Sequence, residues 1–348
     1  MKKGLTLIIL VHILFLAKGQ FYYPLRQDAV DFSKRTLLVQ ILEEDPTVLK
    51  KLGKLYSDKA QLEIKISQYQ DLIKNHNDWI KQAVLKYWKI NEKIEFKTKA
   101  DIDELLHDIK VLRKYAVLNT GWKNEYKYKG TQGEAVEIYG LVAYVAEATD
   151  RHLTDLRRGP DQKTDYIFKI MFPTDAIVLS DFIFAVQQFN FHLSVAASTG
   201  PELERYRTKP FLPPFNKAGY DVIKQKTLLI PQESIPEDKR EDLKIVYEFP
   251  FQLVSNRFLE EAIDHQFGKH TYVTLAWSDH QVNFAYFIVN ASEGIILAEL
   301  GHKPADVKFV NYSLNRESSD ESFVDYKQKM GFSMNNIVQL NHFLATRK

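Results

Sequence analysis

The chain has 348 residues, of which 45% are hydrophobic, with 14 glycines, 12 prolines and no cysteine. This composition is typical of a folded globular protein of one large or two medium domains, and it excludes the disordered and fibrous classes. The lack of cysteine also excludes disulfides, thiol nucleophiles and cysteine-ligated metals.

The first nineteen residues predict a signal peptide. Lys2 and Lys3 precede an apolar run at residues 5–17, and Ala17 and Gly19 place small side chains where a signal peptidase cleaves. The run is shorter than the about 20 residues that span a bilayer. We expect residues 1–19 to be removed, leaving a periplasmic or extracellular protein without a membrane span. Export without cysteine favours a bacterial source.

Charge gives little indication of a partner. Without the three lysines of residues 1–19, 44 basic residues face 45 acidic ones, so the mature chain is close to neutral. A nucleic-acid-binding protein would normally carry a basic excess on one face. We therefore expect no nucleic-acid partner.

After the predicted signal peptide, the chain contains a segment of ambiguous structure and then a long helical segment. Residues 34–45, KRTLLVQILEED, fit either a helix or a buried strand. Across residues 46–88 apolar side chains recur three, four or seven positions apart, which predicts amphipathic helix beginning at Pro46. The polar run NHND at residues 75–78 is expected to break or kink it. This helical insert could present a partner-binding face or mediate self-association.

The next elements predict the order strand, helix, strand. Apolar and charged residues alternate at residues 93–98, and Thr98 and Asp101 form the pattern of a capping box at a helix start. A short apolar run at residues 114–119 precedes NTGW, which is typical of a turn.

This order of elements returns in the second half. Residues 224–234, KQKTLLIPQES, resemble the opening segment, and Pro231 favours a strand in both copies. We predict an α/β fold with two tandem related units, each a mixed, partly parallel sheet flanked by helices, with the long helical insert in the first. The expected boundaries are 20–197 for the first unit, 198–220 for a proline-rich linker and 221–348 for the second unit.

Three segments carry a resemblance to known sequences. Residues 34–45, 81–96 and 243–263 resemble a group of exported, cysteine-free proteins from Bacteroidota that share a W-K/T-x-x-x-x-x-E-F segment and have no assigned activity. The resemblance covers most of the mature chain. It implies export and supplies no function, cofactor or site residue.

Candidate ligand-binding residues follow from the predicted sheets. Ligands of parallel sheets bind beyond the carboxyl ends of the strands. Thr98 and Ser255 stand at such ends and are explained as helix caps. The remaining candidates at these ends are Glu43, Asp45, Asn119, Thr120, Glu233, Asp279 and His280.

No catalytic, metal or cofactor site is assigned. WSDH at residues 277–280 groups serine, aspartate and histidine, but triads assemble from distant segments, and no G-x-S-x-G sequence occurs. The histidines lack the H-x-x-x-H and H-E-x-x-H spacings of metal sites, and no phosphate-binding glycine motif is present. Asn290 and Asn311 begin glycosylation sequons.

Two functions are compatible with these observations. The first is a non-enzymatic binding or assembly component of the cell envelope, which binds an envelope protein or a small ligand, for example in a cleft between the units. The alternative is an envelope hydrolase that uses carboxylates or the Asp279–His280 pair at the strand ends.

Overall fold

The computed structural model describes residues 26–129, 132–145, 166–172, 177–198, 217–232, 235, 237–278, 283–301 and 334–346. The predicted signal peptide and most of the predicted linker lie outside these residues. Residues 217–220 of the predicted linker belong to a helix.

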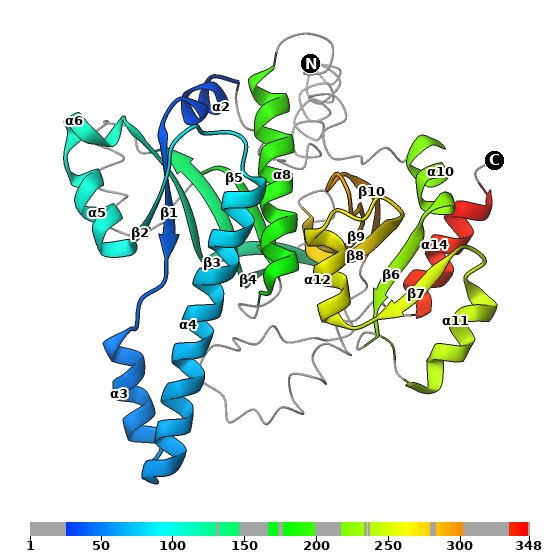
Figure 1. The fold of residues 1–348 in the computed structure, drawn as a ribbon, viewed down its shortest axis with the longest axis horizontal. Coiled ribbons are helices and arrows are strands. Elements are labelled where there is room, and N and C mark those ends of the chain that lie inside the picture. The colour runs from blue at the N-terminus through cyan, green and yellow to red at the C-terminus, as the bar shows by residue number, and fades with distance from the viewer. Residues whose placement is uncertain are drawn as a thin grey trace, which may run out of the picture.

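The first half of the chain contributes one sheet and the helices around it (Figure 1). Its elements are α2 (Arg26–Ser33), β1 (Thr36–Ile41), α3 (Pro46–Leu55), α4 (Lys59–Tyr87), β2 (Ile94–Thr98), α5 (Lys99–His107), α6 (Ile109–Leu112), β3 (Tyr115–Lys129), β4 (Gln132–Val145), β5 (Tyr166–Phe172) and α8 (Leu179–Ala197).

The second half repeats this arrangement with shorter connections. Its elements are α10 (Lys217–Gln225), β6 (Thr227–Pro231), a 3-10 turn (Glu237–Lys239), α11 (Arg240–Val246), β7 (Phe251–Val254), α12 (Asn256–Asp264), β8 (His270–Ser278), β9 (Asn283–Asn290), β10 (Ile296–Gly301) and α14 (Met334–Thr346).

The two sheets have the same topology. Each has five strands, in the orders β2-β1-β3-β4-β5 and β7-β6-β8-β9-β10. The first strand of each half pairs in parallel with the next two, and the last two strands add antiparallel. The Thr98 and Ser255 hydroxyls each accept the backbone N–H three residues ahead, capping α5 and α12. The predicted fold of two related, mixed α/β sheets flanked by helices is confirmed.

The break between the first two long helices lies elsewhere than predicted. The chain leaves α3 at Tyr56 and restarts at Asp58, whose carboxylate accepts the N–H of Gln61 at 2.8 Å. NHND stays inside the 29-residue helix α4. Asn77 does not cap a helix there, because its amide pairs with the backbone N–H and C=O of Leu42 at 2.8 and 2.9 Å. Asn77, part of the run that was expected to break the helix, is thus hydrogen-bonded to a segment that is distant in the sequence.

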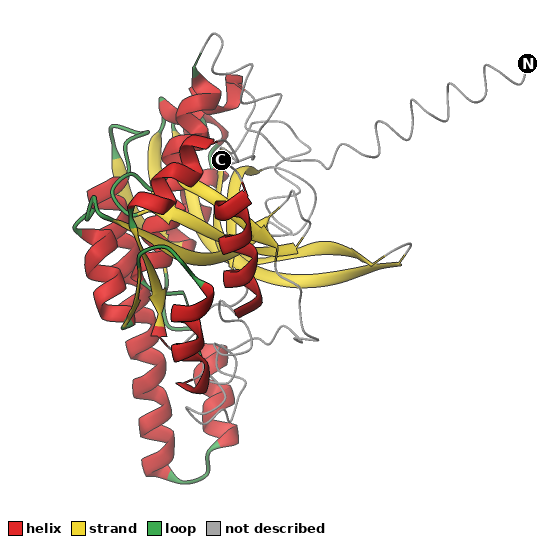
Figure 2. Ribbon diagram, turned by 90° about the vertical axis from the view of Figure 1, so that its right-hand side faces the viewer, coloured by secondary structure: helices red, strands yellow, loops and turns green. Residues whose placement is uncertain are grey.

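Strand β3 also differs from the prediction, because it does not end at the expected NTGW turn. It pairs with β4 from Ala116 through Lys129, whereas β1 covers it only as far as Leu118. Strand β4 in turn pairs with β5 only from Tyr139 onward. Beyond these points β3 and β4 form a two-stranded ribbon that stands out from the body of the molecule (Figure 2).

Helix α8 lies between the two sheets (Figure 1) and is buried almost all round, as its apolar sequence predicts. Toward the first sheet Phe189 meets Phe168, with ring centroids 5.3 Å apart. Toward the second sheet Phe184 stacks on Phe287 at 6.2 Å. A single hydrophobic cluster therefore includes residues of both halves. Among the described helices, none has the length and apolar character to cross a bilayer.

We expect Gly294→Ala to weaken the contact between α8 and the second sheet. Gly294 has φ +70°, its carbonyl accepts the buried Gln188 amide at 2.7 Å, and an added Cβ would clash with the Gln187 side chain. The left-handed backbone alone should cost about 1–3 kcal/mol of unfolding free energy in urea denaturation. Gly53→Ala in α3 is the matched control, because nothing lies within 4 Å of the added Cβ. Equal effects of both variants would contradict this account.

Two buried histidines in α4 and α8 should make the fold sensitive to acid. Burial lowers the pKa of His76 to about 4 and that of His192 to about 3. Since both values lie below 6.5, the unfolded chain binds more protons, and the stability present above pH 6.5 is lost as pH falls toward the folded values. At pH 5 we expect a loss on the order of 2 kcal/mol per histidine.

Urea unfolding at pH 7.5 and pH 5 measures this effect. His76→Leu should reduce the difference in unfolding free energy between the two pH values. An unchanged pH dependence in His76→Leu would show that this histidine is not held neutral.

Candidate functional site

The predicted carboxylates after β1 serve the local structure. Asp45 is the N-cap of α3 and accepts both the backbone N–H and the hydroxyl of Thr47 at 2.7 Å, and these hydrogen bonds hold its pKa below the usual value. Its own N–H donates to the Tyr69 hydroxyl at 2.7 Å. Glu44 accepts the Gln70 amide at 2.9 Å, and Glu43 is exposed. The segment joins β1 to α3, and the Asp45 carboxylate that caps α3 is already hydrogen-bonded to Thr47.

Asn119 and Thr120 do not lie at a strand end, and that part of the prediction is wrong. Because β3 continues to Lys129, both residues lie within the sheet, where Thr120 is buried. Asn119 stands opposite Val142, and Val142 packs with Met171 and with Phe284 of the second half. Among the described residues, the Asn119 Oδ1 and Thr120 Oγ1 atoms have no hydrogen-bond partner.

Glu233, Asp279 and His280 lie outside the described residues. The structure does describe Ser278, whose hydroxyl donates to Glu299 Oε1 at 2.5 Å in a buried contact. Sequence reasoning missed Glu299, although a carboxylate within the apolar run GIILAEL was a visible signal. The contact links the carboxyl end of β8 to the interior of β10 in the second sheet.

The two glycosylation sequons have different outcomes. Asn290 is 5% exposed, and its amide oxygen accepts the Lys226 ammonium at 2.8 Å and the Ser292 hydroxyl at 3.0 Å. A glycan cannot be attached there without opening the fold. Asn311 lies outside the described residues.

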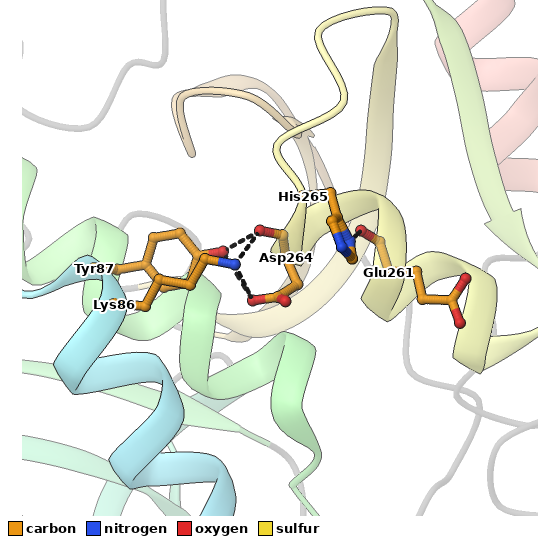
Figure 3. A network of polar contacts seen from close by, with 5 residues as sticks. All are labelled: Lys86, Tyr87, Glu261, Asp264 and His265. Atoms are coloured by element: carbon orange, nitrogen blue, oxygen red, sulfur yellow. Dashed lines mark hydrogen bonds and ion pairs between the residues drawn. The ribbon is translucent and has the colours of Figure 1, made fainter.

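A polar junction ties α4 to the end of α12 (Figure 3). The Tyr87 hydroxyl donates to the Asp264 backbone oxygen at 2.5 Å and lies 3.0 Å from its Oδ1. The Lys86 ammonium lies 2.8 Å from the same backbone oxygen and 3.0 Å from Oδ1. At the same helix end, His265 Nδ1 is 2.8 Å from the Glu261 backbone oxygen.

The protonation states of Asp264 and Tyr87 at this junction are those of a structural hydrogen-bonded contact. Burial by itself would raise the pKa of Asp264, but hydrogen bonds from Lys86 and Tyr87 outweigh it and lower that pKa. Burial and the bond to Asp264 raise the pKa of Tyr87. Near neutral pH the phenol is therefore neutral and the carboxylate ionised, and neither group is poised to exchange a proton.

The junction continues onto α8. The Asn190 amide donates to the Tyr87 carbonyl at 2.5 Å and accepts the Lys89 N–H at 2.9 Å. Helices α4, α8 and α12 are thus joined by hydrogen bonds around a shared apolar core. At this junction the side chains of the two units pack against each other in one hydrophobic cluster, and the ligand cleft between the units stays a prediction.

Neither the described site geometry nor comparison with known proteins assigns a chemistry. Within the described ranges, no group of three histidine, aspartate or glutamate side chains could hold a metal ion. No protein-family model matches the chain, and no curated protein or solved structure is significantly similar to it.

We expect Tyr87→Phe to cost about 0.5–1.5 kcal/mol of unfolding free energy, because it removes the hydroxyl and keeps the packed ring. Lys86→Met should cost less, since its ion pair with Asp264 is partly exposed and water screens it. Urea denaturation at low and high salt separates the two, because only the Lys86 effect should shrink in salt. Lys74→Met, at a more exposed pair with Asp78, is the control without a measurable effect. A larger loss for Lys86→Met than for Tyr87→Phe would contradict this ranking.

Proposed function

We propose that the protein is an exported, non-enzymatic binding or assembly component of the cell envelope that contacts its partner through the α3–α4 hairpin. The observation that carries this proposal is the projection of the two helices away from the body (Figures 1 and 2). Export rests on the predicted signal peptide.

The hairpin presents apolar side chains to solvent. Leu55, Ile64 and Leu72 are 64%, 56% and 47% exposed. Covering each of them would contribute on the order of 1.5–3 kcal/mol at most. Large apolar side chains left exposed on a projecting element favour a protein-binding surface there.

The self-association that was expected from the helical period is less favoured than binding of another protein. Part of the periodic stripe is used inside the hairpin, where Leu52 and Tyr69 are buried. The exposed Ile64 and Leu72 stand eight residues apart and do not belong to the periodic stripe that contains Leu52 and Tyr69. They do not form the continuous seam of a coiled coil.

The hydrolase alternative draws no support from the candidate residues that the structure describes. Asp45 is a helix cap, Glu43 is an exposed loop residue, and Asn119 and Thr120 lie inside a strand. An acid–base or nucleophilic mechanism needs groups within hydrogen-bond reach of one reacting atom.

The test is affinity capture from an envelope fraction of the source cells, with the mature chain immobilised. We expect a distinct captured protein to be lost when Leu55, Ile64 and Leu72 are all changed to serine, because the apolar contact is removed. Leu85→Ser is the matched control, because Leu85 is 69% exposed on the same helix but lies near the body.

Unfolding curves of both variants establish that each is folded. The proposal is wrong if the triple variant captures the same proteins as the unchanged chain, or if the unchanged chain captures none.

A further inference from the structure

The β3–β4 ribbon carries two strand edges that are unpaired in the described structure. Strand β3 has β1 beside it only up to Leu118, so no described strand pairs with its outer edge from Asn119 to Lys129. Strand β4 has β5 beside it only from Tyr139, so its outer edge is open from Gln132 to Ile138. Figure 2 shows this ribbon away from both sheets.

The second half contains the same hairpin without the projection. Strands β8 and β9 pair from Thr271–Asn290 to Ser278–Asn283, so their hairpin is shorter than that of β3 and β4. An isolated two-stranded ribbon is at best marginally stable in water, and open edges are sites where further strands add. The extension in the first half therefore requires a specific use.

The unpaired parts of the two strands carry opposite formal charge. The open part of β3 contains Lys123, Lys127 and Lys129 against Glu125, a net charge of +2. The open part of β4 contains Glu134 and Glu137 and no basic residue, a net charge of −2. Like edges would repel each other, whereas a β3 edge and a β4 edge attract.

We propose that the open β3 edge of one molecule pairs with the open β4 edge of a second copy of this chain. The contact joins two different surfaces, so every molecule retains one free edge of each kind. Such head-to-tail pairing continues into a ring or a linear assembly. Backbone hydrogen bonds supply the contact, and the opposite charges select the edge.

This inference builds on the proposed assembly function and names a second surface for it, at the ribbon and apart from the helical hairpin. If the ribbon proves inert while the hairpin variant still loses its captured protein, the inference alone is wrong. If the ribbon joins molecules while nothing is captured, the proposed function of the hairpin is wrong.

The experiment measures the mass of the mature chain by light scattering over a concentration series at low and high salt. We expect the unchanged chain to associate, at least doubling its mass as concentration rises, and to dissociate at high salt because the charges are screened. The double variant Lys123→Glu/Lys127→Glu gives both edges a net charge of −2, and Glu134→Lys/Glu137→Lys gives both +2. Each double variant alone should stay monomeric.

Mixing the two double variants distinguishes a loss of edge pairing from a loss of the ribbon structure itself. An equimolar mixture of the two double variants should associate again, because each edge of one then meets an oppositely charged edge of the other. The fourfold variant should associate like the unchanged chain, since its edges remain opposite in sign. Lys50→Glu/Lys54→Glu on the exposed side of α3 is the control for a change of total charge and should not affect association.

Three results would overturn the proposal. The first is an unchanged chain that stays monomeric at every concentration, in which case the lysines protect the edge from pairing. The second is association of either double variant alone at the strength of the unchanged chain. The third is a mixture or a fourfold variant that remains monomeric while the unchanged chain associates.

Discussion

Burial of α8 on all sides is the constraint on which the arrangement of the two halves depends. Phe182, Ile183, Phe184, Val186 and Phe189 surround this helix with apolar side chains, and each is almost completely buried. One sheet can cover only one side of such a helix, so the second sheet must cover another. The halves are therefore one folded body with a common core, and the polar contacts of Gln188 and Asn190 fix the position of the helix within it.

Helix α14 occupies in the second half the place that α8 occupies in the first. It follows the last described strand of the second sheet, as α8 follows that of the first. It buries Ile337, Leu340 and Leu344, while Val338 and His342 are exposed. A helix that is apolar on one side packs on one unit, whereas a helix that is apolar on two sides joins two. Helix α14 accordingly packs within the cluster of the second half, whereas α8 belongs to the cluster that both halves share.

The sequence predicted the fold well because its signals were local or periodic. The repeated TLL strands, the apolar helical spacing and the caps at Thr98 and Ser255 all act over a few residues. The errors arose where a distant partner decided the outcome. Asn77 satisfies the backbone of Leu42, 35 residues away, so it leaves α4 intact. NTGW stays extended because β4 pairs along its full length.

The candidate site was predicted less well than the fold for a related reason. Placing ligands at the carboxyl ends of strands presumes that each strand stops at the edge of its sheet. Strand β3 continues into the ribbon, which removes Asn119 and Thr120 from that edge, and Asp45 caps the helix that follows β1. Glu299 and Asp264 could not be found from spacing, because their partners come from other strands and helices.

The long helical segment is better understood as an extended crossover connection than as an insert. Parallel strands need a crossover on one face of the sheet, and α11 makes it in the second half with Leu243 buried in the core. In the first half the last turns of α4 do the same through Ile80, Val84 and Tyr87. The projecting hairpin is therefore a continuation of a helix whose other end is fixed in the core. Its exposed leucines and isoleucine are held on a rigid element, which lowers the entropy lost when a partner binds.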